Sequence, residues 1–512
     1  MVAAAAAAAA SNHAANDATA AKHTAKGAAG NGSQDAAGRN HVVIFPFMAK
    51  GHMLPLFHFA TALTAHHPTL RVTLVTTPGN ASFAQSRLPH SVDLVSLPFP
   101  SLPPLPAGVE STDAVPSPSL HLTFLHATSL LRDPFAAFLA SLPSRPLALV
   151  SDFFLGFTRR VAADAGVPRV VFNGMSCFAS AICKSLSASP PPPTTVPGAL
   201  FHVPGMPDHV QVAVEELPYG VAKRADPDNP VTRFFAEVIG DSDVRSWGVL
   251  VNSLAALDGD YVPALESFYG PGARAWLVGP MFLAAATAGE LDGEQDPEGC
   301  LAWLDDQAAG SVIYLSFGTQ AHVADAQLDE ILHGLVQSGH PFLWAVRSDT
   351  WSPPPVDATH NGLVVRGWVP QRSVLAHAAM GGFVSHCGWN SVMESLAAGK
   401  PLLAWPMIAE QHLNARHLAN VLGVGVRMDV REGMEGVVGR DEVEKKVREL
   451  MDADSKEGKR IREKAAWAQQ EAKSAVSAGG SSTLALDNLL EELQKSYGDH
   501  VVANGAVCTL KD

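Results

Sequence analysis

Short apolar runs alternate with helical patterns along most of this chain, and this alternation constrains its fold more than any other feature. In the first half, HVVIFPF predicts a buried strand, LPLFHFATALTAHH a helix and RVTLVTT a second strand. The same order returns in LALVSDFF, GFTRRVAADAG and VPRVVFN. A helix that connects two strands leaves them parallel, so this half is predicted to be an α/β domain with a doubly wound parallel sheet.

The alternation begins again after residue 300. SVIYLSFGT predicts a strand and a turn, ADAQLDEILHGLVQSG a helix and PFLWAVR a strand, and further strand patterns follow in GLVVRGWV, GGFVSH, PLLAWPM and GVGVRM. Residues 276–300 are rich in Gly, Ala and acidic residues and have little periodicity, which is typical of a linker. We therefore predict a first domain over 40–275, a second over 301–490, whose last helix could pack back on the first, and a tail over 491–512.

The composition excludes several classes of function. The chain has 512 residues, of which 47% are apolar and 17% charged, so it can bury large cores. Its net charge of -14 and its lack of long basic clusters argue against nucleic acid as a partner. Five scattered cysteines, with no C-x-x-C pair, predict a reducing compartment, which we take to be the cytoplasm. Apart from an interrupted alanine tract, no apolar run has the length of a membrane span, so we expect no stable membrane insertion.

Residues 1–39 form an Ala-rich leader of low complexity, with almost no large apolar side chain that could join a core. Such a segment is predicted to be disordered. An organelle transit peptide is the alternative, but those segments are rich in Arg and poor in acids, whereas this leader has one Arg beside Asp17 and Asp35. A secretory signal fits less well, because no positive start precedes a Leu-rich region.

The segment GGFVSHCGWNSVMESLAAG has the pattern of a strand, a glycine turn and a helix. The strand is predicted to end at His386 and the helix to begin at about Ser391. Ligands of open parallel sheets bind beyond the carboxyl ends of the strands, and a helix N-terminus there suits a phosphate. Gly388 allows a close approach to the backbone, while His386, Asn390 and Ser391 can donate hydrogen bonds. We expect a diphosphate to bind at this turn.

A second turn, LSFGT, places Ser316, Gly318 and Thr319 after the first strand of the same domain. Together the two turns predict a two-sided diphosphate site. Other interpretations remain for single residues of the group. Ser391-x-x-Glu394 is also a capping box, which is the favoured interpretation of Glu394 taken alone. Trp368 and Trp389 could be core aromatic residues.

The stretch from Trp368 to Gln411 resembles the 44-residue signature box of plant UDP-dependent glycosyltransferases, with its W-x-P-Q start and its H-C-G-W-N-S centre. The resemblance covers about residues 40–490, including Asn252-Ser253 and the VGP at 278–280, but not the leader. It implies the glycosyltransferase-B fold, in which two doubly wound, Rossmann-like domains face each other. The first domain would mainly bind the acceptor, and the second would mainly bind the UDP-sugar.

The resemblance also implies roles for individual residues of the donor site. The expected contacts are Trp368 stacked on uracil with Val369 and Gln371 nearby, Glu394 on the ribose hydroxyls, His386, Asn390, Ser391, Ser316 and Thr319 around the diphosphate, and Trp389, Glu410 and Gln411 around the sugar. Glu410 stands where the family usually has Asp, so contacts with the sugar hydroxyls could shift. Gln at the last position of the box accompanies glucose in relatives, and His accompanies galactose. Glucose is therefore expected, although its exclusive use stays open.

His52 in MAKGHMLP, at the turn after the first strand, is the candidate catalytic base. A neutral imidazole can accept the proton of an acceptor hydroxyl. Asp152, at the end of another parallel strand in LVSDFF, can fix the tautomer of His52 and stabilise the imidazolium. The resembling family has a His and an Asp in similar settings. The alternatives are a structural or exposed role for His52 and a helix N-cap role for Asp152.

These residues lead to one expected function. We expect an inverting UDP-glycosyltransferase that moves a sugar to a hydroxyl or carboxyl group of a small lipophilic plant metabolite, with flavonoids and other phenolics first and terpenoids or hormones next. No cofactor or metal is expected, because no His/Cys/Asp cluster has ligand spacing, and we expect a monomer. A non-catalytic UDP-sugar-binding protein is one alternative. A nucleotide-dependent oxidoreductase is disfavoured, because no G-x-G-x-x-G follows the first strand.

Overall fold

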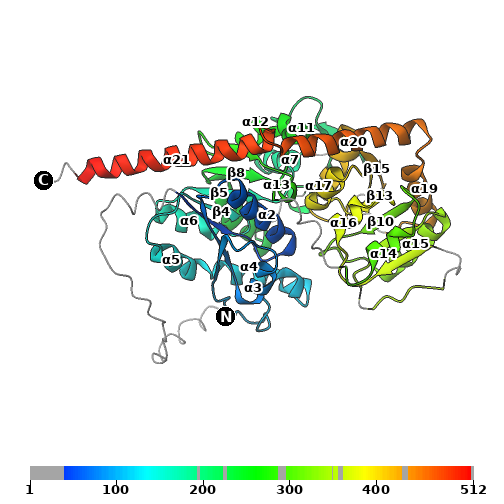
Figure 1. The fold of residues 1–512 in the computed structure, drawn as a ribbon, viewed down its shortest axis with the longest axis horizontal. Coiled ribbons are helices and arrows are strands. Elements are labelled where there is room, and N and C mark those ends of the chain that lie inside the picture. Colours follow the sequence, from blue (N-terminus) through cyan, green and yellow to red (C-terminus); the bar gives the residue numbers. More distant parts are fainter. Residues whose placement is uncertain are drawn as a thin grey trace.

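The computed structural model describes residues 40–192, 196–222, 228–285, 296–348, 350–355, 361–428 and 436–508. The leader predicted over 1–39 lies outside the described residues, and so do residues 286–295 of the predicted linker. The described chain contains two large parallel sheets with helices packed against them, as the alternation predicts (Figure 1). A small antiparallel hairpin, β6 (Leu200–His202) and β7 (Gln211–Ala213), accompanies them.

The first sheet has seven strands in the order β3-β2-β1-β4-β5-β8-β9, and all its pairs are parallel. The order changes direction between β1 and β4. The carboxyl ends of these two strands therefore form the switch point at which open α/β sheets bind ligands. The bounds are β1 His41–Phe45, β2 Arg71–Thr76, β3 Val92–Ser96, β4 Ala148–Asp152, β5 Arg169–Asn173, β8 Gly248–Val251 and β9 Ala275–Leu277.

The second sheet has six parallel strands in the order β12-β11-β10-β13-β14-β15. The order in which successive strands are added reverses between β10 and β13. The second switch point therefore lies at the carboxyl ends of these two strands. The bounds are β10 Val312–Ser316, β11 Phe342–Ala345, β12 Gly362–Val365, β13 Met380–Ser385, β14 Leu402–Ala404 and β15 Gly425–Arg427.

Helices connect the strands of both sheets. In the first half they are α2 Lys50–His66, α3 Pro78–Gln85, α4 His121–Ser129, α5 Arg132–Ser141, α6 Phe157–Asp164, α7 Cys177–Ala188, α8 Tyr219–Ala222, α9 Pro230–Arg233, α10 Asp241–Val244, α11 Ala255–Asp258, α12 Val262–Glu266 and α13 Met281–Ala285. In the second half they are α14 Cys300–Asp305, α15 Asp325–Ser338, α16 Gln371–Ala376, α17 Trp389–Ala397, α18 Gln411–Arg416, α19 Arg440–Met451, α20 Lys456–Ala475 and α21 Ser481–Cys508. Short 3-10 turns η1 Thr112–Ala114, η2 Pro118–Leu120, η3 Val214–Glu216 and η5 Gly259–Tyr261, and the π-helical segments η4 Phe234–Gly240 and η7 His417–Leu422, complete the described elements.

Helix α2 begins one turn earlier than its apolar pattern predicts. The pattern starts at Leu54, whereas the helix starts at Lys50 and includes Pro55. Its first residues, Lys-Gly-His, show no apolar periodicity, which is why the pattern misses them. His52 therefore lies in the first turn of a helix and not in the loop that we expected after β1.

The last helix, α21, follows α20 of the second domain and packs on the first sheet (Figure 1). Leu486, Leu489 and Leu490 are buried in the same apolar cluster as strands β1, β2 and β4. In addition, the Trp276 indole of β9 donates a hydrogen bond of 3.1 Å to Asn488 Oδ1. This one helix thus ties the C-terminal end of the chain to the first domain.

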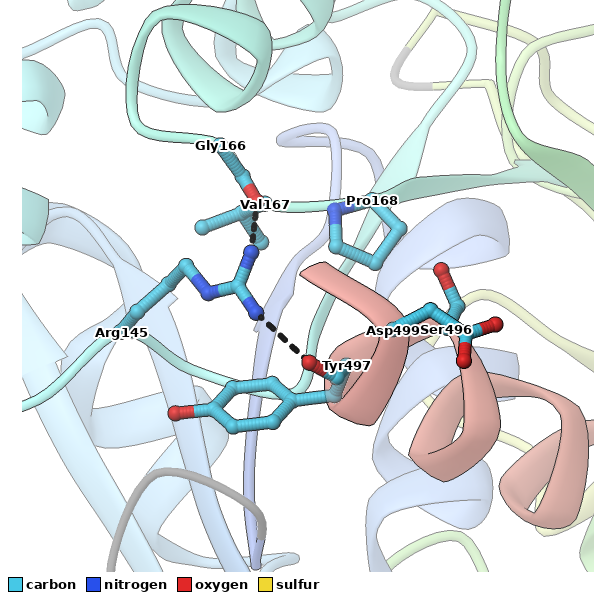
Figure 2. Close-up of a pocket in the computed structure, with 7 residues that line it drawn as sticks. All are labelled: Arg145, Gly166, Val167, Pro168, Ser496, Tyr497 and Asp499. Atoms are coloured by element: carbon cyan, nitrogen blue, oxygen red, sulfur yellow. Dashed lines mark hydrogen bonds between the residues drawn. The ribbon is translucent and has the colours of Figure 1, made fainter. Parts of the chain in front are cut away.

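Arg145 holds the end of α21 against the first domain (Figure 2). Its guanidinium donates hydrogen bonds to the backbone oxygens of Gly166, at 2.6 Å, and of Tyr497, at 3.5 Å, and lies 4.3 Å from the centroid of the Tyr497 ring. These residues border a cavity of about 360 Å³. Gly166 precedes β5, so this contact lies at the sheet edge opposite the carboxyl ends of the strands.

Candidate active site between the two sheets

His52 and Asp152 meet at the switch point of the first sheet. Asp152 is the last residue of β4 and is fully buried, and His52 lies in the helix that follows β1. Because β1 and β4 are adjacent and parallel, the two side chains meet although they are 100 positions apart, with His52 Nδ1 2.8 Å from Asp152 Oδ2. The structure thus places the two residues predicted for proton transfer in one hydrogen-bonded pair.

Asp152 makes further contacts that fix its carboxylate. Its Oδ1 accepts a hydrogen bond of 2.9 Å from the backbone N–H of Phe154, and its carbonyl oxygen accepts one of 3.1 Å from the buried Arg169 guanidinium. Helix α6 begins later, at Phe157, and has Gly156 as its N-cap. The alternative interpretation of Asp152 as a helix cap is therefore wrong, and the carboxylate holds a turn and the imidazole instead.

Two opposing effects act on the proton affinity of His52. Burial disfavours the imidazolium, but the charge and the hydrogen bond of Asp152 outweigh burial, so the pKa of His52 is raised. Glu410 of the second domain raises it further, and burial raises the pKa of Glu410 itself. The pair therefore favours the state in which His52 has accepted a proton, as a general base requires.

Phenylalanine rings surround the His52 imidazole. The ring centroids of Phe47, Phe153 and Phe154 lie 5.5, 6.1 and 5.4 Å from that of His52. Phe154 stacks on Phe47 at 4.8 Å and meets the edge of Phe235, which is 39% exposed, at 5.7 Å. These rings were not predicted from the sequence, although Phe47 and the Phe153-Phe154 pair stand within two residues of the ends of β1 and β4.

The two turns of the predicted diphosphate site face each other at the second switch point. Ser316 ends β10 and pairs in register with Ser385, which ends β13. A Cβ atom at Gly318 would lie 2.7 Å from His386 Nε2, and one at Gly388 would lie 2.5 Å from the same atom. The imidazole of His386 therefore packs closely against both glycines. Glycine is needed at 318 for a second reason, its φ of +73°.

Helix α17 points the N–H groups of its first turn toward this site. It begins at Trp389, two residues before the predicted start, and its N-cap Gly388 has no side chain to satisfy those groups. Ser391 is therefore the third helical residue and not the cap. The capping box that we favoured for Ser391 and Glu394 is wrong for this reason.

His386 stays neutral in this environment. Burial lowers the pKa of its imidazole to about 4, against the opposing hydrogen bond with the Ser316 backbone. Its buried Nδ1 atom has no hydrogen-bond partner in the described chain. A buried polar atom without a partner costs stability unless a ligand or water satisfies it, so this atom marks a place for a polar ligand.

Next to the diphosphate site lies a group of linked polar side chains. Gln371 Nε2 donates to Ser391 Oγ at 3.1 Å and to Glu394 Oε2 at 2.6 Å, and Gln371 Oε1 accepts from the Tyr314 hydroxyl at 3.2 Å. Trp368, three positions before Gln371, is 38% exposed, so part of its ring surface is accessible. The structure brings these predicted residues together at one edge of the diphosphate site.

Other predicted donor-site residues are placed differently. The Trp389 ring and the Val369 side chain belong to the apolar core, and Trp389 Nε1 donates to the Asn252 carbonyl at 2.9 Å. The interpretation of Trp389 as a core aromatic thus matches its position. Gln411 is buried and its Oε1 accepts from the backbone N–H groups of Met407 and Ile408. Thr319 is exposed beyond the β10 turn.

The arrangement sets the predicted proton acceptor of the first domain against the predicted diphosphate site of the second. Asn390 Nδ2 donates to the Gly51 carbonyl at 2.6 Å, so the two switch points are in direct contact. Within the described residues, no group of three or more His, Cys, Asp or Glu side chains could hold a metal ion. In the same part of the chain, every helix is too short or too polar to cross a membrane.

Comparison with known proteins accounts for this arrangement. The family model described as UDP-glucoronosyl and UDP-glucosyl transferase matches residues 276–501, which contain the diphosphate site. UDP-glycosyltransferase 90A1 of Arabidopsis thaliana is 37% identical over 482 residues, covering 89% of this chain and 97% of the relative. Anthocyanin 3'-O-beta-glucosyltransferase of Gentiana triflora is 34% identical over 483 residues, covering 88% and 98%.

A solved structure extends the match to the fold. UGT73P12 of Glycyrrhiza uralensis, complexed with glycyrrhetinic acid 3-O-monoglucuronide, superposes with a TM-score of 0.81 at 30% identity and covers 92% of this chain and 98% of its own. The predicted glycosyltransferase-B fold is confirmed by this match and by the two parallel sheets. Because both sheets and nearly the whole length of the relatives are matched, the chain belongs to the plant UDP-glycosyltransferase family.

Proposed function

We propose that the protein transfers glucose from UDP-glucose to a hydroxyl group of a small phenolic acceptor, with inversion at the anomeric carbon. One observation carries this proposal: the hydrogen-bonded His52–Asp152 pair of the first domain lies opposite the two turns of the second domain at which we expect a diphosphate to bind. A carboxyl group is an alternative acceptor, because it is already ionised at neutral pH and its oxygen can attack without losing a proton.

The donor would bind along β13 and α17. The first-turn N–H groups of α17 and its positive dipole end would meet the diphosphate, together with His386, Asn390, Ser391 and Ser316. A neutral His386 can still donate one N–H to a phosphate oxygen. Trp368 would stack on the uracil, and Glu394, tied to Gln371, would bind the ribose hydroxyls. We propose that these groups neutralise the leaving UDP without a divalent cation.

The reaction would be one displacement. His52 takes the proton of the acceptor hydroxyl at Nε2, while Asp152 holds the Nδ1–H and stabilises the imidazolium. The acceptor oxygen forms a bond to the anomeric carbon as the bond from that carbon to the β-phosphate oxygen breaks, and UDP leaves toward α17. Attack from the face opposite the leaving group inverts the anomeric configuration.

Two observations support a phenolic acceptor and glucose as the sugar. The rings of Phe47, Phe153, Phe154 and Phe235 form an aromatic wall beside the base, against which a flat aryl ring can stack. The relative from Gentiana triflora is named for glucosyl transfer to an anthocyanin. Glu410 is one methylene longer than the Asp usual in the family, so we propose relaxed contact with the sugar hydroxyls and some use of other UDP-sugars.

The test is a transfer assay with UDP-glucose, UDP-galactose and UDP-glucuronic acid against a panel of flavonoids, simple phenols and terpenoid alcohols. The proposal predicts a glucoside of a phenol with inverted configuration by NMR, and an unchanged rate after EDTA treatment. Binding of UDP without turnover of any acceptor would favour the non-catalytic alternative. Light scattering and fractionation would test our further proposal that the protein is a cytoplasmic monomer.

A further inference from the structure

Helix α2 contains a proline at a position where it removes one backbone hydrogen bond. In an α-helix, the N–H of each residue bonds the carbonyl four positions earlier. Pro55 has no N–H, so the Gly51 carbonyl in the first turn of α2 lacks the partner that residue 55 would otherwise supply. Gly51 directly precedes the candidate base His52 in the sequence.

That carbonyl accepts a hydrogen bond from the other domain. Asn390 Nδ2, in the first turn of α17, donates to Gly51 O at 2.6 Å. The amide of Asn390 is oriented from its other end, because its Oδ1 accepts from Asn252 Nδ2 at 3.3 Å. Asn252 is itself held, since its Oδ1 accepts from the Met281 N–H at 2.9 Å. The contact is therefore part of a connected set across the domain boundary.

The bond acts on the segment that carries His52. The Asp152 carboxylate holds the imidazole at Nδ1, while the N–H groups of His52 and Met53 bond the Ala49 carbonyl at 2.9 and 2.8 Å, which leaves the Gly51 carbonyl to the other domain. The bond from Asn390 holds the peptide group between Gly51 and His52. An amide nitrogen has two hydrogens, so Asn390 can donate the second one to the diphosphate while it holds Gly51.

We propose that Pro55 is a positioning residue, which keeps the Gly51 carbonyl available to Asn390 and thereby fixes the base relative to the donor. His52 then has its working position only when the two domains are in contact. This inference rests on the proposed function, in which His52 is the base. Pro55 contributes by the absence of its N–H, so its effect on the rate depends on Asn390.

The decisive variant is Pro55→Ala. It restores an N–H that competes with Asn390 for the Gly51 carbonyl, so kcat with UDP-glucose and a phenolic acceptor should fall about tenfold, equivalent to about 1.4 kcal/mol. The affinity for UDP, measured by calorimetry, should change less than about twofold, well under the tenfold that 1.4 kcal/mol represents. The melting temperature should stay equal or rise, because alanine favours a helix interior far more than proline does. A purely structural proline would instead lose stability and activity together.

The matched control is Pro263→Ala. Pro263 is exposed at the second position of α12, where a helix needs no N–H, so kcat should be unchanged. A double-variant cycle then tests whether the effect of Pro55→Ala on kcat depends on Asn390. In an Asn390→Ala background, Pro55→Ala should change kcat less than about twofold, because the partner for the carbonyl is already absent.

Three results would overturn the inference. One is full kcat in Pro55→Ala, and another is an equal loss of kcat when Pro55→Ala is made in the wild type and in the Asn390→Ala variant. The third is a loss of kcat that is matched by a fall in melting temperature. The wild-type protein separates this outcome from failure of the proposed function. If the wild type transfers sugar and Pro55→Ala does so equally well, only the inference fails. If the wild type binds UDP but transfers nothing, the proposed function fails.

Discussion

At the scale of single residues, Asp152 is the group on which the site most depends. Its two carboxylate oxygens bind different partners, His52 Nδ1 and the Phe154 N–H, so it orients the candidate base and holds the backbone of one residue of the aromatic wall. The position of Asp152 at the end of β4 was predictable from the alternation of strands and helices, and so was the position of His52 in the segment that follows β1. The rings around them were not, because ring contacts depend on side-chain rotamers across distant segments.

The pH dependence of Asp152→Asn tests this role. In the wild type, kcat/KM should fall as pH drops through the raised pKa of His52, because only the neutral imidazole accepts a proton. The variant loses the carboxylate that raises the pKa, whereas burial, which lowers it, remains. In the plot of kcat/KM against pH, the fall on the acidic side should therefore move to lower pH, while the highest value of kcat/KM falls about a hundredfold. A fall on the acidic side that stays in place or moves to higher pH would contradict the assigned cause.

At the scale of elements, the strand–turn–helix units hold the residues of the candidate site, and their first helical turns were the hardest part to predict. Helices α2 and α17 both begin earlier than their apolar patterns. Their first turns contain Gly, His, Trp and Asn, which serve contacts between the domains instead of an apolar face. The capping-box prediction failed for the same reason. A helix that begins at Trp389 leaves its first N–H groups directed at the diphosphate site.

Gly388→Ala tests the geometry of this element. The added Cβ atom would lie 2.5 Å from His386 Nε2, so the imidazole of His386 or the turn itself would have to shift. Overpacking of this kind costs about 1 to 3 kcal/mol, so calorimetry should show UDP affinity reduced about tenfold or more. Gly270→Ala is the control, since a Cβ atom there meets nothing within 4 Å. Unchanged UDP binding in Gly388→Ala would show that the turn is not the diphosphate site.

At the scale of the whole molecule, the two domains are joined by polar contacts that no local pattern could predict. Glu216 of the first domain is buried and bonds both Arg416 and Arg427 of the second, about 200 positions away. Burial alone would raise the pKa of the Glu216 carboxyl, but the two arginines hold it below its ordinary value. The signature segment predicted that its polar residues gather at one switch point, yet it could not show that Trp389 and Val369 pack in the core, because the motif does not encode burial.

Glu216→Gln should destabilise the fold by about 3 kcal/mol at neutral pH, because it leaves two part-buried arginines without their carboxylate. A depressed folded-state pKa stabilises the fold above the ordinary Glu range, and this contribution is lost as pH falls through the folded-state value. In urea unfolding, the difference in free energy of unfolding between wild type and variant should therefore be smaller at about pH 3.5 than at pH 7. The control Asp93→Asn breaks a half-exposed pair with Arg71 and should cost less than about 1 kcal/mol. An equal difference at both pH values would contradict this account of the interface.

The most direct test of the central claim, that His52 of one domain is the base for a donor bound by the other, is His52→Ala with UDP-glucose and a phenolic acceptor. The account predicts a fall in kcat of about a thousandfold, while the calorimetric affinity for UDP stays within about twofold of the wild type. The exposed His90 serves as the control, and His90→Ala should keep wild-type turnover. Near-normal turnover in His52→Ala, or a loss of UDP binding as large as the loss of rate, would contradict the claim.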